Sequence, residues 1–253
     1  MKNAATHLIA SVVSALISGS LAAAPNAPIK TAQLSADDKK QETSLAAITY
    51  KAPLRGAPAT RVGGGTRSAA ARTFALSALA PNETGYTTRD KPTIYWYVSE
   101  ALQKPVELTI ISNESLEAAA KPALELTLQP PVAGGVHAIS LEEHGLALKP
   151  GVEYQWFVAI VNDTAQRSND IIAGGTIKRV AETDSVRSSL KSAPAASRPA
   201  LYAAEGIWYD AVDELSRQIR AEPANRRLHE QRAALLEQVG LTEAAAFDRS
   251  SLR

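Results

Sequence analysis

The chain has 253 residues, and its 27 lysines and arginines nearly balance its 26 aspartates and glutamates. This balance provides no global attraction to nucleic acid or to an anionic membrane surface, so we expect no nucleic acid among its partners. The chain contains no cysteine, which excludes disulfides, thiol catalysis, cysteine-based zinc sites and iron–sulfur clusters. The fold must therefore be stabilised by its core alone.

The N-terminus has the parts of a secretory signal peptide. A basic second residue precedes an apolar run over 8–24, and small residues close such a run in exported proteins. Ser20 and Ala22 predict cleavage after Ala22, so that residues 1–22 form the signal. An uncleaved membrane anchor is the alternative, but the run is at the short end of the about 20 apolar residues that a span requires. We expect cleavage, a periplasmic or secreted protein, and no transmembrane span in the mature chain.

Residues 23–72 have the composition of a disordered, basic linker. They are rich in Ala, Pro, Gly, Thr and Ser, and the stretch over 43–82 contains basic residues but no acidic ones. This composition favours a solvated linker, and the alternative is an arm that docks on an acidic partner. The glycines at 63–65 lack the flanking strand, helix and Lys-Ser/Thr pair of a phosphate loop. We therefore interpret them as flexible backbone.

From residue 73 the pattern changes to short segments in which apolar and polar residues alternate, as in half-buried β-strands. The segment over 154–161 is apolar on both faces, which predicts a central strand. Gly174-Gly175 predicts a bulge in the last segment. The expected strands cover 74–79, 92–98, 106–110, 124–128, 136–141, 154–161 and 170–180.

A motif before one of these strands indicates the fold class. Pro150-Gly151 forms a turn, Tyr154 can direct its hydroxyl back to the preceding backbone, and Trp156 lies on the same side of the strand. This is the tyrosine-corner pattern of immunoglobulin and fibronectin-type sandwiches, the alternative being an ordinary strand after a turn. The sequence thus predicts a mainly β fold, with an immunoglobulin/fibronectin-like β-sandwich over 73–181. Such sandwiches have many unrelated functions, so the fold assigns no activity.

After a second loose segment over 182–199, expected to be a linker, the apolar residues take a helical period. Two apolar stripes end near Pro223 and Gly240, and a third helix follows. The spacing of small and apolar residues is similar to tetratricopeptide repeats, with only about one and a half repeats present, too few for a solenoid. Residues 200–253 should form a short tetratricopeptide-like α-helical appendage whose apolar face the sandwich or a partner covers.

Several stretches occur along the chain in a fixed order, among them Tyr95-Trp96-Tyr97, Tyr154-Gln155-Trp156, Arg167-Ser168-Asn169-Asp170 and Gly206-Ile207-Trp208-Tyr209-Asp210. With their flanking residues they cover about 63–241 and resemble a bacterial family, common in cyanobacteria, known as domain of unknown function 928. A cysteine that members often carry before the Arg-Ser element is missing here. The resemblance implies export to the bacterial cell envelope and a sandwich followed by helices, and it brings no established activity.

Motifs of known chemistry are not found in this sequence. It contains neither Gly-x-Ser-x-Gly nor His-Glu-x-x-His, and we expect no cofactor. His137 and His144 flank two glutamates, but seven positions apart on a strand they face opposite sides, and further ligands are lacking. No metal site is therefore expected. His229, early in an expected helix, should lie at the surface.

The strongest candidate for a binding site is the connection between the two longest strands. Asp163, Arg167 and Asp170, with Ser168 between them, could recognise a polar or charged group, because loops of sandwiches often bind ligands. Alternatively, Arg167 and Asp170 pair with each other or with backbone and shape the hairpin, which is the interpretation we favour.

A second candidate consists of Tyr202, Trp208, Tyr209 and Asp210, whose aromatic side chains would form a docking patch if they are exposed. Packing of the helix on the sandwich explains Trp208 as well, and we favour that interpretation.

Two function hypotheses remain. The first is a non-enzymatic binding or scaffolding module whose partner is another envelope protein or a cell-surface component. The second is an exported hydrolase or carbohydrate-active enzyme that uses Asp163, Asp170 or Glu142 as acid or base, which requires two carboxylates in one cleft. The lack of a recognisable catalytic constellation favours the first.

Overall fold

The computed structural model describes residues 48–53, 64–66 and 74–251, which lie in one compact unit. The expected signal peptide over 1–22 and most of the expected linker over 23–72 fall outside the described residues. None of the helices in this part of the chain combines the length and the apolarity that crossing a bilayer requires.

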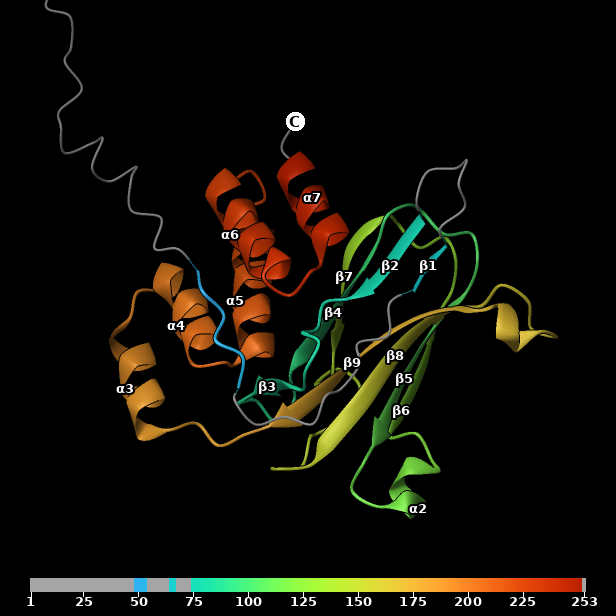
Figure 1. Cartoon of the computed structure of the whole chain (residues 1–253), viewed down its shortest axis with the longest axis horizontal. Helices are drawn as coiled ribbons and strands as arrows, with labels where there is room; N and C mark the ends of the chain where they lie inside the picture. Colours follow the sequence, from blue (N-terminus) through green and yellow to red (C-terminus); the bar gives the residue numbers. More distant parts are fainter. Residues whose placement is uncertain (1–47, 54–63, 67–73, 252–253) are drawn as a thin grey trace, which may run out of the picture. The chain divides into compact units, whose positions relative to one another are not determined.

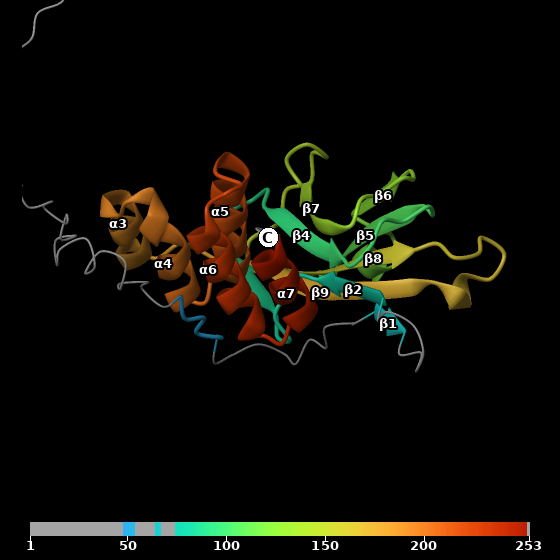
Figure 2. The same cartoon turned by 90° about the horizontal axis from the view of Figure 1, so that it is seen from above.

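The described residues form nine strands in two sheets (Figures 1 and 2). The first sheet is antiparallel throughout and contains, in spatial order, β1 (Gly64–Thr66), β2 (Phe74–Ala78), β4 (Thr93–Val98) and β7 (Gly135–Ser140). The second contains β3 (Gly85–Thr87), β9 (Ile171–Arg179), β8 (Glu153–Ile160), β5 (Val106–Ser112) and β6 (Leu124–Leu128). Its strands are antiparallel except that β3 pairs with β9 in parallel, with Gly85 opposite Ile177.

Alternation of side chains explains how these strands bury one face. In β5 every second residue, from Val106 through Leu108 and Ile110, is buried. The same period places Trp156 of β8 in the core, while Gln155 beside it is exposed. Strand β8 is central, between β9 and β5, as predicted.

The expected bulge at Gly174-Gly175 is wrong, because β9 pairs with β8 without interruption through both glycines. The two glycines have another structural reason. A Cβ on Gly175 would lie 2.4 Å from the Cβ of Ala80, and one on Gly174 would lie 2.5 Å from the Phe157 ring. These positions are glycine because neighbouring side chains already fill the room that a side chain would need.

The hydrogen bond expected of the Tyr154 hydroxyl is present. The Lys149 N–H donates to the hydroxyl of Tyr154 over 3.1 Å, and Gly151 adopts a φ of +76° in the turn between them, a conformation that glycine accepts without strain. Trp156 follows fully buried.

Of the residues that the structure describes, about 33% are helical and 28% lie in strands, so the class is mixed α and β and not mainly β as predicted. They are α2 (Leu116–Ala119), α3 (Asp184–Ser192), α4 (Arg198–Ala204), α5 (Trp208–Ala221), α6 (Arg226–Glu237) and α7 (Thr242–Ser250). Two 3₁₀ turns, η1 (Arg167–Asn169) and η2 (Ala195–Ser197), complete the elements.

Part of the difference comes from 182–199, where we expected a linker and the structure has α3 and η2. The hydroxyl of Thr183 caps α3 by accepting the N–H of Val186. Val186 and Leu190 then pack against Ile207 in a small cluster of their own. Only two apolar residues anchor this helix, which is too weak a periodicity to detect in the sequence.

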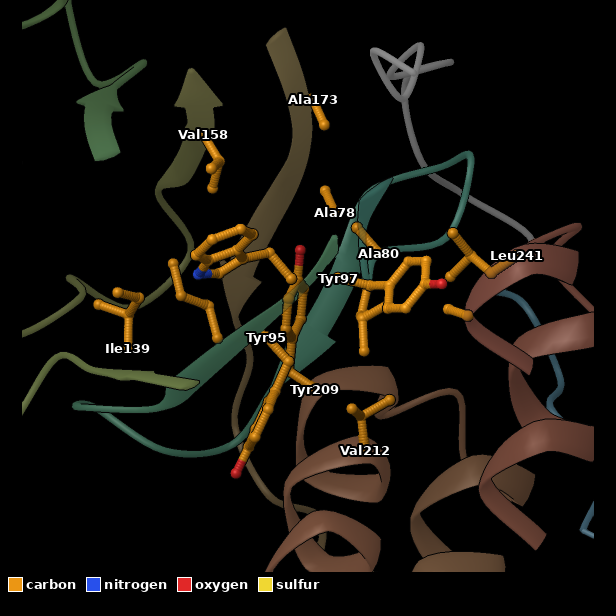
Figure 3. Close-up of a cluster of buried hydrophobic side chains, with 14 of the residues drawn as sticks. Ala78, Ala80, Tyr95, Tyr97, Ile139, Val158, Ala173, Tyr209, Val212 and Leu241 are labelled. Atoms are coloured by element: carbon orange, nitrogen blue, oxygen red, sulfur yellow. The ribbon is translucent and has the colours of Figure 1, made fainter. Parts of the chain in front are cut away.

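One continuous core joins both sheets to α4, α5, α6 and α7 (Figure 3). Two buried residues at the start of α5 connect them by hydrogen bonds. Trp208 donates its Nε1–H to the carbonyl of Leu79 over 2.8 Å. The Tyr209 hydroxyl accepts the Nε1–H of Trp156 over 2.8 Å and donates to a carbonyl of β9. The apolar face of the helices is thus covered by the sheets.

Two pieces of the expected linker belong to this compact unit. Residues 64–66 form β1 and pair with β2, so here the glycines are in a strand. Ile48 is buried in the shared core, and residues 48–53 contact the helices. For these pieces the linker prediction is wrong. Ile48 is buried in the core although its neighbours in sequence are mostly small or polar, and residues 64–66 pair with a strand.

Candidate functional site

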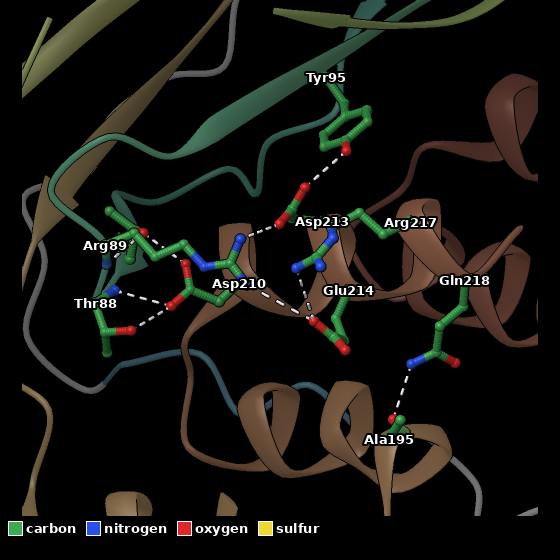
Figure 4. Close-up of polar contacts among 10 residues, drawn as sticks. Thr88, Arg89, Tyr95, Ala195, Asp210, Asp213, Glu214, Arg217 and Gln218 are labelled. Atoms are coloured by element: carbon green, nitrogen blue, oxygen red, sulfur yellow. Dashed lines mark hydrogen bonds and ion pairs between the residues drawn. The ribbon is translucent and has the colours of Figure 1, made fainter. Parts of the chain in front are cut away.

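Helix α5 begins with a buried carboxylate. Asp210 accepts three hydrogen bonds (Figure 4). Its Oδ1 accepts from the hydroxyl of Thr87, and its Oδ2 accepts from the hydroxyl of Thr88 and from the N–H of Thr88, the latter over 3.0 Å. Burial raises the pKa of Asp210, because the charged form loses its hydration, and the three hydrogen bonds oppose that rise. Asp210 thereby joins the first turn of α5 to the end of β3.

One turn further along α5, Asp213 accepts hydrogen bonds from the Arg89 guanidinium and from the Tyr95 hydroxyl, the latter at 2.8 Å (Figure 4). Glu214 lies 3.7 Å from the same guanidinium. Burial, reinforced by the adjacent carboxylate of Asp213, raises the pKa of Tyr95 above its ordinary value, which keeps the phenol protonated and donating. This cluster fixes α5 against β4 and defines the floor of a cleft.

The cleft has a volume of about 760 Å³ and lies between α5, the β3–β4 connection, β7 with the turn after it, and the end of β9. Its lining is rich in charge of both signs. The cations are Arg89, Lys91, Arg179, Arg217 and Arg220, and the anions are Asp90, Glu142, Glu143 and Asp213.

Several of these charged side chains already have partners inside the protein. Arg89 pairs with Asp213, Arg179 donates to the carbonyl of Leu148, and Arg217 lies 3.7 Å from Glu214. Asp90 accepts the backbone N–H of Lys91 over 3.0 Å. Within the described ranges, the side chains of the remaining charged residues of the lining form no ion pair or hydrogen bond; they are Lys91, Arg220, Glu142 and Glu143. The cleft can therefore bind a polar ligand that carries both positive and negative groups.

The loop predicted as the best binding site is not part of this cleft. Arg167 donates to Asp170 over 2.7 Å and makes a two-pronged contact with Glu107 of β5. Asp170 also accepts the N–H of Asn162 over 3.1 Å. These contacts correspond to the hairpin-shaping role that we favoured, with Glu107 as a partner sixty positions away in sequence that local patterns do not reveal.

The other carboxylates considered for catalysis are separated from one another. Asp163 accepts the N–H of Ala165 over 2.8 Å within the loop, and Ser168 beside it is exposed in η1. Glu142 lines the polar cleft, whereas Asp170 lines a different hollow on the face of the second sheet. In the described part of the chain, these three carboxylates do not share a cleft.

Trp208, Tyr209 and Asp210 of the second candidate are almost completely buried, so they do not form an exposed docking patch. The polar atoms of Trp208 and Tyr209 are occupied by Leu79, Trp156 and the carbonyl of Thr176. The favoured alternative for Trp208, packing of the helix on the sheets, is confirmed.

The histidines are placed by packing. His137 stacks on Trp96 with ring centroids 4.5 Å apart, and its Nε2 lies 2.7 Å from the carbonyl of Ala133. The expected surface position of His229 is wrong, because α6 turns this residue inward, where its Nδ1 lies 3.5 Å from Asp248. Among the described residues, no three His, Asp or Glu side chains gather as a metal ion requires.

The cleft escaped the sequence analysis because its residues come from segments more than a hundred positions apart. One local signal was available. Asp210 and Asp213 are spaced by three within the apolar stripe of α5 and are buried there. Carboxylates at buried helical positions need partners, and those partners are Thr87, Thr88 and Arg89 of the β3–β4 connection.

A search of curated proteins found no match for the chain. A family model, described as Domain of Unknown Function (DUF928), matches residues 62–248. The match extends from β1 to the last turns of α7 and includes both sheets and the whole polar cleft. The chain therefore belongs to the DUF928 family, as the motifs of its sequence indicated.

Proposed function

We propose that this chain is an exported protein of the bacterial cell envelope that binds another envelope component without chemical conversion, and that the polar cleft is its binding site. The observation that carries the proposal is the pattern of free charge at the cleft. Two cations, Lys91 and Arg220, and two carboxylates, Glu142 and Glu143, line it without partners among the described residues. Charges in such an arrangement favour a partner with complementary charge and disfavour others.

The floor of the cleft supports a binding role. Arg89, Asp213 and Tyr95 are held by one another and by α5, so the cleft is preformed and little ordering accompanies binding. The carboxylates named for the hydrolase alternative, Asp163, Asp170 and Glu142, are separated from one another, so no pair of them faces one substrate as that alternative requires.

The proposal includes a finer assignment of the fold. We infer that the two sheets form an immunoglobulin/fibronectin-like sandwich and that α4 to α7 form a tetratricopeptide-like appendage. The hydrogen bond between Lys149 and Tyr154 and the buried Trp156 support the first part. Two successive helices, α5 and α6, that end near Pro223 and Gly240 support the second.

Export rests on the N-terminal sequence alone, and direct sequencing tests it. We expect the protein in the envelope fraction to begin at Ala23, because Ser20-Leu21-Ala22 fits a signal peptidase site. Protein that retains Met1 in this fraction contradicts cleavage.

The binding site is tested with a pair of charge-matched variants of the exported chain. In the first, Lys91→Glu and Arg220→Glu reverse the two free cations of the cleft. In the second, Lys121→Glu and Arg226→Glu make the same change in charge at exposed positions outside the cleft. Envelope components that co-purify with the wild-type chain are then quantified for both variants.

We expect recovery of the partner to fall at least about tenfold for the cleft variant, as for loss of well-placed charged contacts, and to remain unchanged for the control. If neither variant reduces recovery of the partner, the assignment of the cleft is contradicted. If both variants reduce it equally, the partner is attracted by overall charge alone, which contradicts the assignment as well.

A further inference from the structure

A short extended segment of the chain lies in a groove of the helices. Residues 48–53, coloured blue in Figure 1, run beside α4. The N–H of Lys51 donates to the carbonyl of Ala203 in α4 over 3.0 Å. The rings of Tyr50 and Trp208 make an edge-to-face contact, with centroids 4.9 Å apart and an angle of 72° between the ring planes.

A side-chain amide at the end of α6 binds the backbone of this segment through both of its polar atoms. Gln238 donates from Nε2 to the carbonyl of Ile48 over 2.9 Å and accepts the N–H of Tyr50 at Oε1, also over 2.9 Å. A neighbouring strand in a parallel sheet bonds the carbonyl of one residue and the N–H two residues later in the same way. The contact therefore recognises an extended backbone, whatever its sequence.

The groove also accommodates side chains at two positions. Ile48 is buried in the shared core and Tyr50 packs on Trp208, and residues two apart lie on the same side of an extended chain. Gly206 leaves room for the backbone just after Tyr50, since its φ is +74° and a Cβ there would lie 2.7 Å from the carbonyl oxygen of Lys51.

This segment does not satisfy the groove completely. The hydroxyl of Tyr50 is buried without a hydrogen-bond partner in the part of the chain that the structure describes. A buried polar atom left without a partner weakens the association that buries it. A ligand with phenylalanine at this position avoids that cost and can compete with the chain's own segment.

We propose that this groove is a binding site for an extended peptide of a partner protein, with an aliphatic residue followed two positions later by an aromatic one, and that residues 48–53 occupy it when the partner is absent. The ligand is recognised through its backbone by Gln238 and Ala203 and through its aromatic ring by Trp208. The site is separate from the polar cleft, because neither Gln238 nor Ala203 lines that cleft.

The test uses the full chain and a fluorescent peptide with the sequence of residues 45–54 carrying Tyr50→Phe. In the wild-type chain the tethered segment competes at an effective concentration of about 1 mM, so the peptide should bind weakly. Tyr50→Ala in the chain weakens the competitor and leaves the groove intact. Fluorescence anisotropy should then show binding tightened at least about tenfold.

Two glutamines provide matched variants in the Tyr50→Ala background. Gln238→Ala removes both bonds to the peptide backbone and should abolish the gain. Gln218→Ala removes an amide that donates to the carbonyl of Ala195, outside the groove, and should preserve it. Equal binding to the wild-type and Tyr50→Ala chains overturns the proposal, and so does a gain that survives Gln238→Ala.

A second measurement applies if circular dichroism shows that Tyr50→Ala does not fold. A protease site inserted between residues 54 and 63 allows the wild-type segment to be cut free after folding, and the labelled peptide should then replace it. Failure to exchange overturns the proposal. A wild-type dimer in size-exclusion chromatography that Tyr50→Ala converts to monomer overturns it too, since the occupant is then a second copy of the chain.

Discussion

Single polar atoms decide how the helices attach to the sheets. The hydroxyl of Tyr209 accepts from Trp156 and donates to Thr176, so one oxygen satisfies two buried groups on neighbouring strands. A buried polar group that is hydrogen-bonded contributes little net free energy to folding, but it destabilises the fold strongly when its partner is removed. The junction is therefore most sensitive at residues whose polar atoms cannot reach water.

We predict that Tyr209→Phe lowers the free energy of unfolding by about 1–3 kcal/mol, because it leaves buried groups of Trp156 and Thr176 without partners. Tyr97→Phe is the matched control: Tyr97 is also buried, and its hydroxyl makes no hydrogen bond to a described residue. The control should change stability by less than about 0.5 kcal/mol. Urea denaturation of both variants measures the difference, and equal values would refute this role of the Tyr209 hydroxyl.

Asp210 predicts a dependence on pH. Burial raises its pKa from the ordinary 3.8 in the folded chain, so the folded state binds this proton more tightly than the unfolded state does. The resulting stabilisation is complete below the ordinary pKa and is lost as pH rises through the folded value. Since Asp210→Asn cannot titrate, the stability of the wild-type chain relative to this variant should decline as pH increases.

Paired urea denaturation curves at pH 4, 5, 6 and 7 check this, with the wild-type chain and Asp210→Asn measured under the same conditions. A relative stability that increases with pH would show that the hydrogen bonds from Thr87 and Thr88 outweigh burial. The variant should be less stable than the parent at every pH, because its amide nitrogen faces the N–H of Thr88 or displaces a hydroxyl donor.

At the scale of elements, β9 depends on the absence of side chains. Gly175 faces Ala80 so closely that a Cβ on Gly175 would lie 2.4 Å from the Ala80 Cβ. Ala80 itself is completely buried, so neither side can relax into solvent. The glycine lets β9 approach the segment that follows β2 this closely.

Gly175→Ala should therefore destabilise the chain by about 1–3 kcal/mol, as expected for overpacking of a core. Ala80→Gly removes the opposing methyl, and the double variant should lose less stability than the sum of the two single variants, because it removes the steric conflict. Thermal or chemical unfolding of all three variants provides the test. Additive losses would place the cost of Gly175→Ala in the strand backbone and contradict the packing argument.

The loop between β8 and β9 is a second element whose role can be measured. Asp170 is bonded to both Arg167 and the N–H of Asn162, and its side chain is only 3% exposed. Asp170→Ala should cost about 1–3 kcal/mol, since the N–H of Asn162 loses its partner.

Arg167→Ala should cost less than Asp170→Ala, since its side chain is half exposed and solvent screens its ion pairs. The double variant should cost less than the sum, because the first change already breaks the pair. Stability unchanged in both single variants would show that these residues do not shape the hairpin, and would return the loop to the candidate binding sites.

At the scale of the whole molecule, local patterns predicted the elements and missed the contacts between them. Alternation located β5 and β8, and the turn before Tyr154 predicted its hydrogen bond, because these features depend on residues close in sequence. The pairing of Arg167 with Glu107, and the binding of Asp210 by Thr87 and Thr88, join distant segments. No local period encodes them, and the polar cleft could not be predicted for the same reason.

The shared core predicts how the chain responds to truncation. A chain that begins at residue 48 should be as stable as one that begins at residue 23, whereas a chain that begins at residue 54 loses the burial of Ile48 and the contact between Tyr50 and Trp208. We expect the shorter chain to be less stable by about 2–4 kcal/mol, mainly from lost apolar burial. Thermal melting of the three purified chains measures this difference in stability. Equal stabilities of the chains that begin at residues 48 and 54 would contradict it.

The parallel pairing of β3 with β9 has a consequence for the time course of folding. Gly85 pairs with Ile177, and Thr87 and Thr88 donate to Asp210. The early strand β3 therefore cannot complete its contacts until residues about a hundred positions later have been synthesised. Contacts across such separations close slowly. A ribosome would release nearly the whole chain before the second sheet could be completed, and the newly made polypeptide would spend that interval with its strand edges open to chaperones.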